Sequence, residues 1–200
     1  MAVSSEVQIC NLALSRIGDG TTIQSRTEES AQAIACNLVY DKARDSLLRD
    51  IDPGFARRVT TLALTGTAPD YWTYSYAMPT DALAIRFIYS EAYQRFSRDE
   101  QAYEVASNAS GQLIWTDIQF ARAAYTASIS DTIFFDEAFT DALILRVAAD
   151  IAMPITSDQP TRDNVVREYL AAVSRAKAQN MRESYEDYTR WTASQIEARS

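Results

Sequence analysis

The side chains best suited to acid–base or metal chemistry form two acidic pairs. Glu28 and Glu29 follow a polar loop, and Asp136 and Glu137 follow a second polar stretch. Neighbouring carboxylates can bind a divalent cation or act as the acid and base of a glycosidase. Each pair also stands where a helix is expected to begin, and the helix dipole favours negative charge there. The dipole accounts for both pairs, so we expect no catalytic, cofactor-binding or metal-binding residues.

Histidine is absent from the sequence. Its absence excludes Ser-His-Asp and Cys-His catalysis, and zinc sites with histidine ligands. The 5 glycines form no GxGxxG or P-loop pattern that would hold a phosphate. The enzymatic alternative that remains is a carboxylate-based hydrolase of the cell envelope, and we favour a protein that is not an enzyme.

The two cysteines, Cys10 and Cys36, lie in segments with helical spacing. The N-terminus lacks the basic start and long apolar run of a signal peptide, so we expect folding in a cytoplasm. Thiols in a reducing compartment are usually free and buried, and we expect this for both cysteines. A disulfide and a thiol nucleophile are the alternatives.

The chain is acidic, with a formal net charge of −8. Residues 1–161 carry 12 basic and 21 acidic side chains, whereas residues 162–200 carry 7 and 6. An acidic body disfavours stable binding of nucleic acid, because phosphate contacts need clustered cations. No run approaches the roughly 18 apolar residues that a membrane span requires.

Apolar spacing predicts four helices. Ser5 and Gln8 form a capping box for the first, which Gly18 ends. Thr27 is the expected N-cap of the second helix, which ends before residues 52–54. A buried third helix runs from Asp136 to Pro154, and Thr161 opens a fourth. The predicted core stripe of the second helix is Ala31, Ala35, Val39, Ala43 and Leu47, widened by Ile34 and Leu38.

The middle of the chain has the period of strands. Strand-like pieces cover residues 71–76, 83–89, 102–107, 112–116 and 121–129. We therefore expect a mainly helical α+β fold: a helix bundle with a small antiparallel β-sheet inserted at about residues 70–130. Residues 1–180 would form the body, and residues 181–200 a C-terminal extension.

Aromatic and arginine side chains suggest surfaces for contact. Trp72, Tyr74 and Tyr76 share one face of a strand, which favours a buried sheet face packed on the helices. The alternative is a contact with a neighbouring subunit. Arg57 and Arg58 are expected to be solvated or salt-bridged, with an ion pair between subunits as the alternative.

The C-terminal extension carries apolar side chains spaced 4, 3, 3 and 5 residues apart, which approximates one face of a helix. This face either folds back on the body or docks against a partner. The residues concerned are Met181, Tyr185, Tyr188, Trp191 and Ile196.

Four segments, in this order, resemble one known family. They are the "LxxIG" start within residues 10–18, the "FARR…LAL" stretch of residues 55–64, the "WxYxYxxPxDxL" core of residues 72–83 and the "FDxxFxxAL…RxAxxIA" helix of residues 134–152. Together they span about three quarters of the chain. They are similar to the head-to-tail connector, or tail-tubular-protein-A-like, family of tailed bacteriophages.

This resemblance implies a structural virion protein without catalytic residues or cofactors. It implies a ring of about twelve copies beneath the portal protein, assembled in the host cytoplasm, with a nozzle or stopper protein on the tail side. Double-stranded DNA would pass through the lumen without specific binding. The family's C-termini reach the portal, so the resemblance favours portal docking for the extension. Another neck or tail-completion protein is the alternative role.

Overall fold

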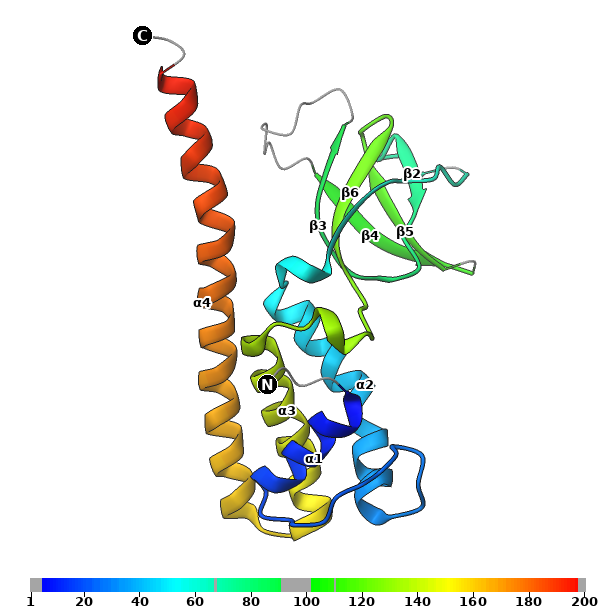
Figure 1. Ribbon diagram of the computed structural model, residues 1–200. Coiled ribbons are helices and arrows are strands. Elements are labelled where there is room, and N and C mark those ends of the chain that lie inside the picture. The colour runs from blue at the N-terminus through cyan, green and yellow to red at the C-terminus, as the bar shows by residue number, and fades with distance from the viewer. Residues whose placement is uncertain (1–4, 67, 91–101, 110, 198–200) are drawn as a thin grey trace. The chain divides into compact units, whose positions relative to one another are not determined.

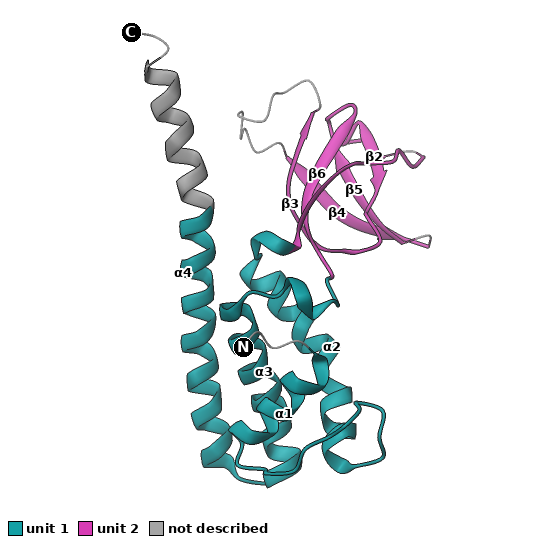
Figure 2. Ribbon diagram, in the orientation of Figure 1, with its two compact units in different colours: residues 1–55, 129–200 teal, residues 56–128 magenta. Residues whose placement is uncertain are grey.

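The computed structural model describes residues 5–66, 68–90, 102–109 and 111–197, with side chains described as far as Glu183. The chain forms two compact units (Figure 2). Residues 1–55 and 129–200 form the helical unit, and residues 56–128 form the β unit. The predicted mainly helical α+β fold is confirmed, although the β segment begins at Ala56 and not near residue 70.

The third helix forms the centre of the helical unit and packs against the other three (Figure 1). Its apolar side chains are buried around most of its circumference, as their crowded spacing predicted. The helices are α1 (Glu6–Arg16), α2 (Ala31–Ile51), α3 (Glu137–Thr156) and α4 (Gln159–Glu197).

Two helix starts follow directly from the local sequence. The Ser5 hydroxyl accepts a hydrogen bond from the backbone N–H of Gln8 at 3.1 Å. The Asp136 carboxylate accepts one from the N–H of Phe139 at 2.7 Å. Each bond satisfies a backbone donor that has no partner within its helix, so α1 and α3 begin where the sequence predicted.

The expected N-cap of the second helix was wrong. Ser30 caps α2, accepting a hydrogen bond from the N–H of Ala33 at 3.2 Å. Thr27 lies in the preceding turn, because the Glu28 carboxylate accepts hydrogen bonds from the backbone of Gln24 and holds that turn outside the helix. A side-chain contact within the loop thus delayed the start of the helix.

The predicted core stripe of α2 was also wrong over its first half. Ile34 is 59% exposed and Leu38 is 81% exposed. Apolar residues occur on two faces of this helix, so periodicity alone does not decide which face meets α3. The buried side chains, which include Ala43 and Leu47 as predicted, are Ala33, Cys36, Tyr40, Ala43, Arg44, Leu47, Leu48 and Ile51.

Pro154 does not end the third helix, as the sequence had suggested. It lies inside the last turn, where the missing N–H removes only one helical bond, and α3 continues to Thr156. The end comes at Ser157, whose left-handed backbone (φ 53°) lets its N–H bond the Met153 carbonyl at 3.1 Å. The fourth helix then begins at Gln159, before the predicted Thr161.

The β unit contains two three-stranded antiparallel sheets. Sheet A has the strand order β1-β6-β3 and sheet B has the order β2-β5-β4. Five of the six strands match predicted segments, while the first one was not predicted. The strands are β1 (Arg57–Thr61), β2 (Tyr74–Ala77), β3 (Ala82–Ser90), β4 (Tyr103–Asn108), β5 (Gly111–Thr116) and β6 (Ala121–Ala127).

The segment after β1 joins the two sheets. The N–H of Leu62 donates to β6, whereas Ala63 and Thr65 exchange backbone hydrogen bonds with β2. Both sheets therefore contribute to one core. Its centre is Tyr76, whose hydroxyl donates to the Ile118 carbonyl at 2.8 Å. The core residues are Leu62, Tyr76, Ile88, Ile114, Ala121 and Ala123.

Candidate functional site: interaction surfaces of the two units

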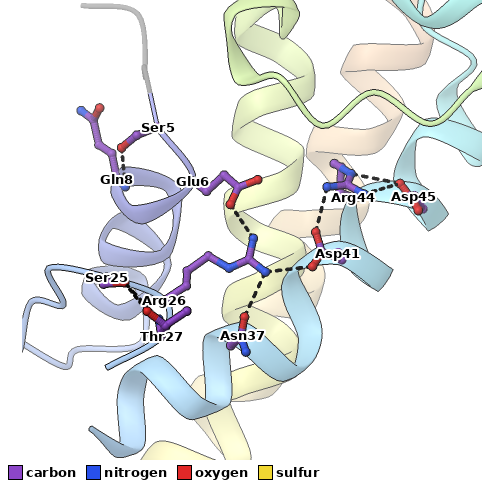
Figure 3. A network of polar contacts seen from close by, with 10 residues as sticks. All are labelled: Ser5, Glu6, Gln8, Ser25, Arg26, Thr27, Asn37, Asp41, Arg44 and Asp45. Carbon is purple, nitrogen blue, oxygen red and sulfur yellow. Dashed lines mark hydrogen bonds and ion pairs between the residues drawn. The ribbon is translucent and has the colours of Figure 1, made fainter. Parts of the chain in front are cut away.

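A polar network around Arg26 holds α1, the following loop and α2 together (Figure 3). The Arg26 guanidinium donates to the carboxylate of Glu6 at 2.6 Å, to that of Asp41 at 2.8 Å and to the amide oxygen of Asn37 at 3.1 Å. It also lies 4.5 Å from the centre of the Tyr40 ring. The Arg26 side chain is only 13% exposed, whereas its partners Glu6 and Asp41 are 35% and 58% exposed.

The network continues along α2. Asp41 also accepts a hydrogen bond from Arg44 at 2.8 Å, and the Arg44 guanidinium reaches Asp45 at 3.0 Å. Burial acts to raise the pKa of Asp41, but the bonds and charges of Arg26 and Arg44 outweigh burial and hold that pKa below its ordinary value. The sequence showed Arg26 only as the end of a polar loop, so its role was missed.

The two acidic pairs have structural roles. Glu28 lies before α2 and not in its first turn, which corrects the dipole explanation for that pair. A hydrogen bond from Ser30 and backbone bonds from the loop lower the pKa of Glu28. Asp136 is the N-cap of α3 and Glu137 lies in its first turn, as predicted.

Acid should weaken this part of the helical unit. Hydrogen bonds from Gln32 and Thr21 lower the pKa of Asp19, and the pKa values of Glu28 and Asp41 are lowered as described. A carboxylate with a lowered pKa contributes stability above its unfolded pKa and loses it as the pH falls through the folded one. We therefore expect the free energy of unfolding to fall below about pH 4.5.

Urea unfolding at several pH values, followed by circular dichroism, measures this fall. The Glu28→Gln variant cannot titrate at this position, so its fall should be smaller than that of the unchanged protein. Glu29→Gln serves as the control because Glu29 is the exposed neighbour of Glu28. Equal falls for Glu28→Gln and Glu29→Gln would contradict the role of Glu28.

Cys10 and Cys36 are both fully buried free thiols, as expected. A hydrogen bond with Cys36, together with burial, raises the pKa of the Cys10 thiol. A raised pKa leaves little thiolate at neutral pH and so disfavours nucleophilic chemistry at Cys10.

Within the described residues, no group of three or more His, Cys, Asp or Glu side chains could hold a metal ion. The helices found there are also too short or too polar to cross a membrane. A groove between α3 and α4 combines acidic, basic and small side chains. It is lined by Glu137, Ala138, Asp141, Ala172, Arg175 and Gln179.

The contact of α4 with the rest of its unit extends to Asn180. Val165, Ala172 and Ala176 are buried on its inner face. The Asn180 amide then donates to the carbonyls of Ile51 at 3.2 Å and Asp52 at 2.8 Å, which satisfies acceptors at the end of α2.

The residues predicted to dock follow this contact. Met181 is 70% exposed, and Arg182 and Glu183 are exposed as well. Tyr185, Tyr188, Trp191 and Ile196 lie outside the side chains that the structure describes. The helix itself continues to Glu197.

The three aromatic residues of the predicted sheet face differ in their surroundings. Tyr76 is fully buried and Tyr74 packs against the same core, with the two ring centres 6.3 Å apart. Trp72 precedes β2, and its indole N–H donates to the Glu104 carboxylate at 3.1 Å. The face thus packs within the β unit at Tyr74 and Tyr76, while Trp72 belongs to a surface.

That surface is an aromatic patch of Tyr71, Trp72 and Trp115 with Glu104. The Tyr71 ring is 67% exposed and lies 6.4 Å, between ring centres, from each tryptophan. Asp117 fixes the adjoining backbone by accepting two hydrogen bonds from Thr73, at 2.9 and 2.8 Å. The part that Glu104 and Trp115 play in this patch was not predicted from the sequence, because cross-strand neighbours depend on strand register.

Arg57 and Arg58 lie on β1, an edge strand of sheet A, and both are exposed. The Arg58 guanidinium donates to the Arg57 carbonyl at 2.9 Å. Charged residues on an edge strand discourage unwanted pairing with other sheets. They also make this edge a positively charged surface.

A comparison with protein-family models and a search of curated proteins both found no match for this chain.

Proposed function

We propose that this chain is a structural subunit of a tailed bacteriophage, a head-to-tail adaptor that docks as a ring of about twelve copies beneath the portal protein. The observation that carries the proposal is the exposure of α4 directly after its contact with α2. Asn180 contacts the end of α2, whereas Met181, the first residue of the predicted docking face, is 70% exposed. An exposed apolar side chain at the start of this face supports a role in docking a partner.

The residues behind the family resemblance support the same proposal, because they determine the fold of this chain. Gly18 has the left-handed backbone (φ 81°) that follows α1, and Tyr76 is the centre of the β core. Asp136 caps α3 and Phe139 is buried within it. A sequence that resembles the family at such positions is expected to share its architecture, and the ring beneath the portal is inferred by analogy with that family.

The adaptor would extend the DNA channel below the portal and provide the surface on which the tail-side protein assembles. We expect the DNA to pass without specific binding, since the chain is acidic overall. The role as another neck or tail-completion protein is distinguished by its partner, which would not be the portal.

Removing residues 181–200 should abolish portal binding and leave the protein folded. The described contacts of α4 with the helical unit, including those of Asn180, precede the deleted segment. Circular dichroism should still show a cooperative melt, while co-sedimentation with the cognate portal protein should fail.

The matched control for the deletion is Leu38→Glu, which changes an exposed apolar side chain of α2. This variant should bind the portal as the unchanged protein does, whereas Trp191→Glu should not. The proposal fails if the full-length protein does not bind the portal. Portal binding by the truncated protein would show that docking uses another surface.

A further inference from the structure

The arginines of the β unit lie on one of its two sheets. Within the described residues of this unit, every arginine lies on a strand of sheet A, namely Arg57, Arg58, Arg86 and Arg122. Among the described carboxylates, Glu104 lies on β4 and Asp117 directly follows β5, both of sheet B, whereas Asp81 directly precedes β3 of sheet A and accepts a hydrogen bond from the Tyr125 hydroxyl at 3.1 Å. The arginines on β1 of one copy and Glu104 on β4 of a second copy are complementary in charge.

Sheet B also carries the aromatic patch. A guanidinium group stacks on aromatic rings and pairs with a carboxylate in one plane, and no other side chain combines these two properties. The exposed Tyr71 ring and the Glu104 carboxylate offer both.

Each of the two surfaces includes an edge strand with an exposed valine. Val59 on β1 is 51% exposed and adjoins Arg58. Val105 on β4 is 46% exposed and adjoins Glu104. Successive side chains of a strand point to opposite faces, so only a contact that runs along the two strand edges reaches the valines together with the charged groups. Such a contact would shield part of each valine from water.

We propose that the arginine-bearing strand β1 of one copy docks against the aromatic patch of a second copy. The two surfaces differ, so the contact is heterologous, and its repetition closes a ring when the rotation between copies allows. The inference rests on the proposed function, since it names the contact that joins neighbouring subunits of the adaptor ring. It can nevertheless be tested without a portal.

The test uses the double variant Val59→Cys and Val105→Cys, which retains Arg57, Arg58 and Glu104. Oxidised glutathione converts two thiols on neighbouring copies into a disulfide and is itself reduced to two thiols. A non-reducing gel should show a ladder of dimers, trimers and larger species. Each single variant should stay monomeric, because its cysteine faces a valine of the next copy, and an equal mixture of the two should stop at dimers. The native Cys10 and Cys36 are fully buried.

Charge reversal in the same background tests the specificity of the contact. Glu104→Arg should reduce the ladder about tenfold, because it places like charges opposite each other. Adding Arg57→Glu and Arg58→Glu should restore it. The matched control is Glu29→Arg, an exposed residue of the helical unit, which should leave the ladder unchanged.

Absence of a ladder, or a ladder that Glu104→Arg does not reduce, would overturn the inference. Circular dichroism of each variant shows that it is folded before it is cross-linked. Portal binding, measured separately, decides the proposed function. Formation of the ladder without portal binding would support this contact and contradict the adaptor role. Portal binding without a ladder would support the adaptor role and contradict this contact.

Discussion

Replacing Phe139 by alanine should lower the free energy of unfolding of the helical unit by about 3–5 kcal/mol. Phe139 is 1% exposed, and its ring lies 5.3 Å from that of Phe55 and 4.9 Å from that of Phe135, between centres. Both pairs have the edge-to-face geometry that aromatic rings favour. The substitution removes these contacts and leaves a cavity that the neighbouring rings fill only partly.

Urea unfolding followed by circular dichroism measures the change. Phe134→Ala is the matched control, because Phe134 belongs to the same aromatic run but is 56% exposed. We expect its effect to stay within about 0.5 kcal/mol. Similar losses for the two variants would mean that Phe139 is not the side chain on which packing depends.

The second large effect is expected at Arg26. Arg26→Ala removes charged hydrogen bonds to Glu6 and Asp41 and the contact with the Tyr40 ring. Removing one partner of a fully buried ion pair costs about 3–5 kcal/mol. Glu6 and Asp41 are 35% and 58% exposed and regain water, so we expect a smaller loss of about 2–3 kcal/mol.

Two further variants distinguish the geometry of Arg26 from its charge. Arg26→Lys retains the charge but not the planar fork that reaches three acceptors, so its loss should lie between those of the alanine variant and the unchanged protein. Arg16→Ala is the control, since Arg16 is exposed on α1. Full stability of Arg26→Lys would show that a single charge is sufficient at this position.

The sequence by itself determined the features that depend on near neighbours. Ser5 and Asp136 cap helices through bonds to residues three positions later, so both helix starts could be predicted. The alternation of Tyr74 and Tyr76 likewise predicted a strand with one inner face. Composition excluded whole classes of chemistry, because a chain without histidine cannot form the sites that need it.

Tertiary structure decided everything that depends on distant partners. Apolar residues occupy two faces of α2, and only packing against the rest of the helical unit, including Cys10 of α1 and Arg26, selects the face of Cys36 and Tyr40 over that of Leu38. The strand β1 was missed because its pattern is exposed and polar, and its hydrogen bonds come from the distant β6. In both cases the element is stabilised by contacts with distant residues, which the local spacing of apolar residues does not reveal.

The candidate surfaces also combine features that were visible in the sequence with features that only the fold creates. The aromatic residues Tyr71 and Trp72 were visible in the sequence, but Glu104 lies beside Trp72 only because β4 and β2 both pair with β5. Arg26 was an ordinary loop residue until the fold brought Glu6 and Asp41 to it. Residue types and their spacing along the chain determined most of the helices and strands. Long-range strand pairing and burial decided which side chains meet, because these interactions act between residues that are far apart in the chain.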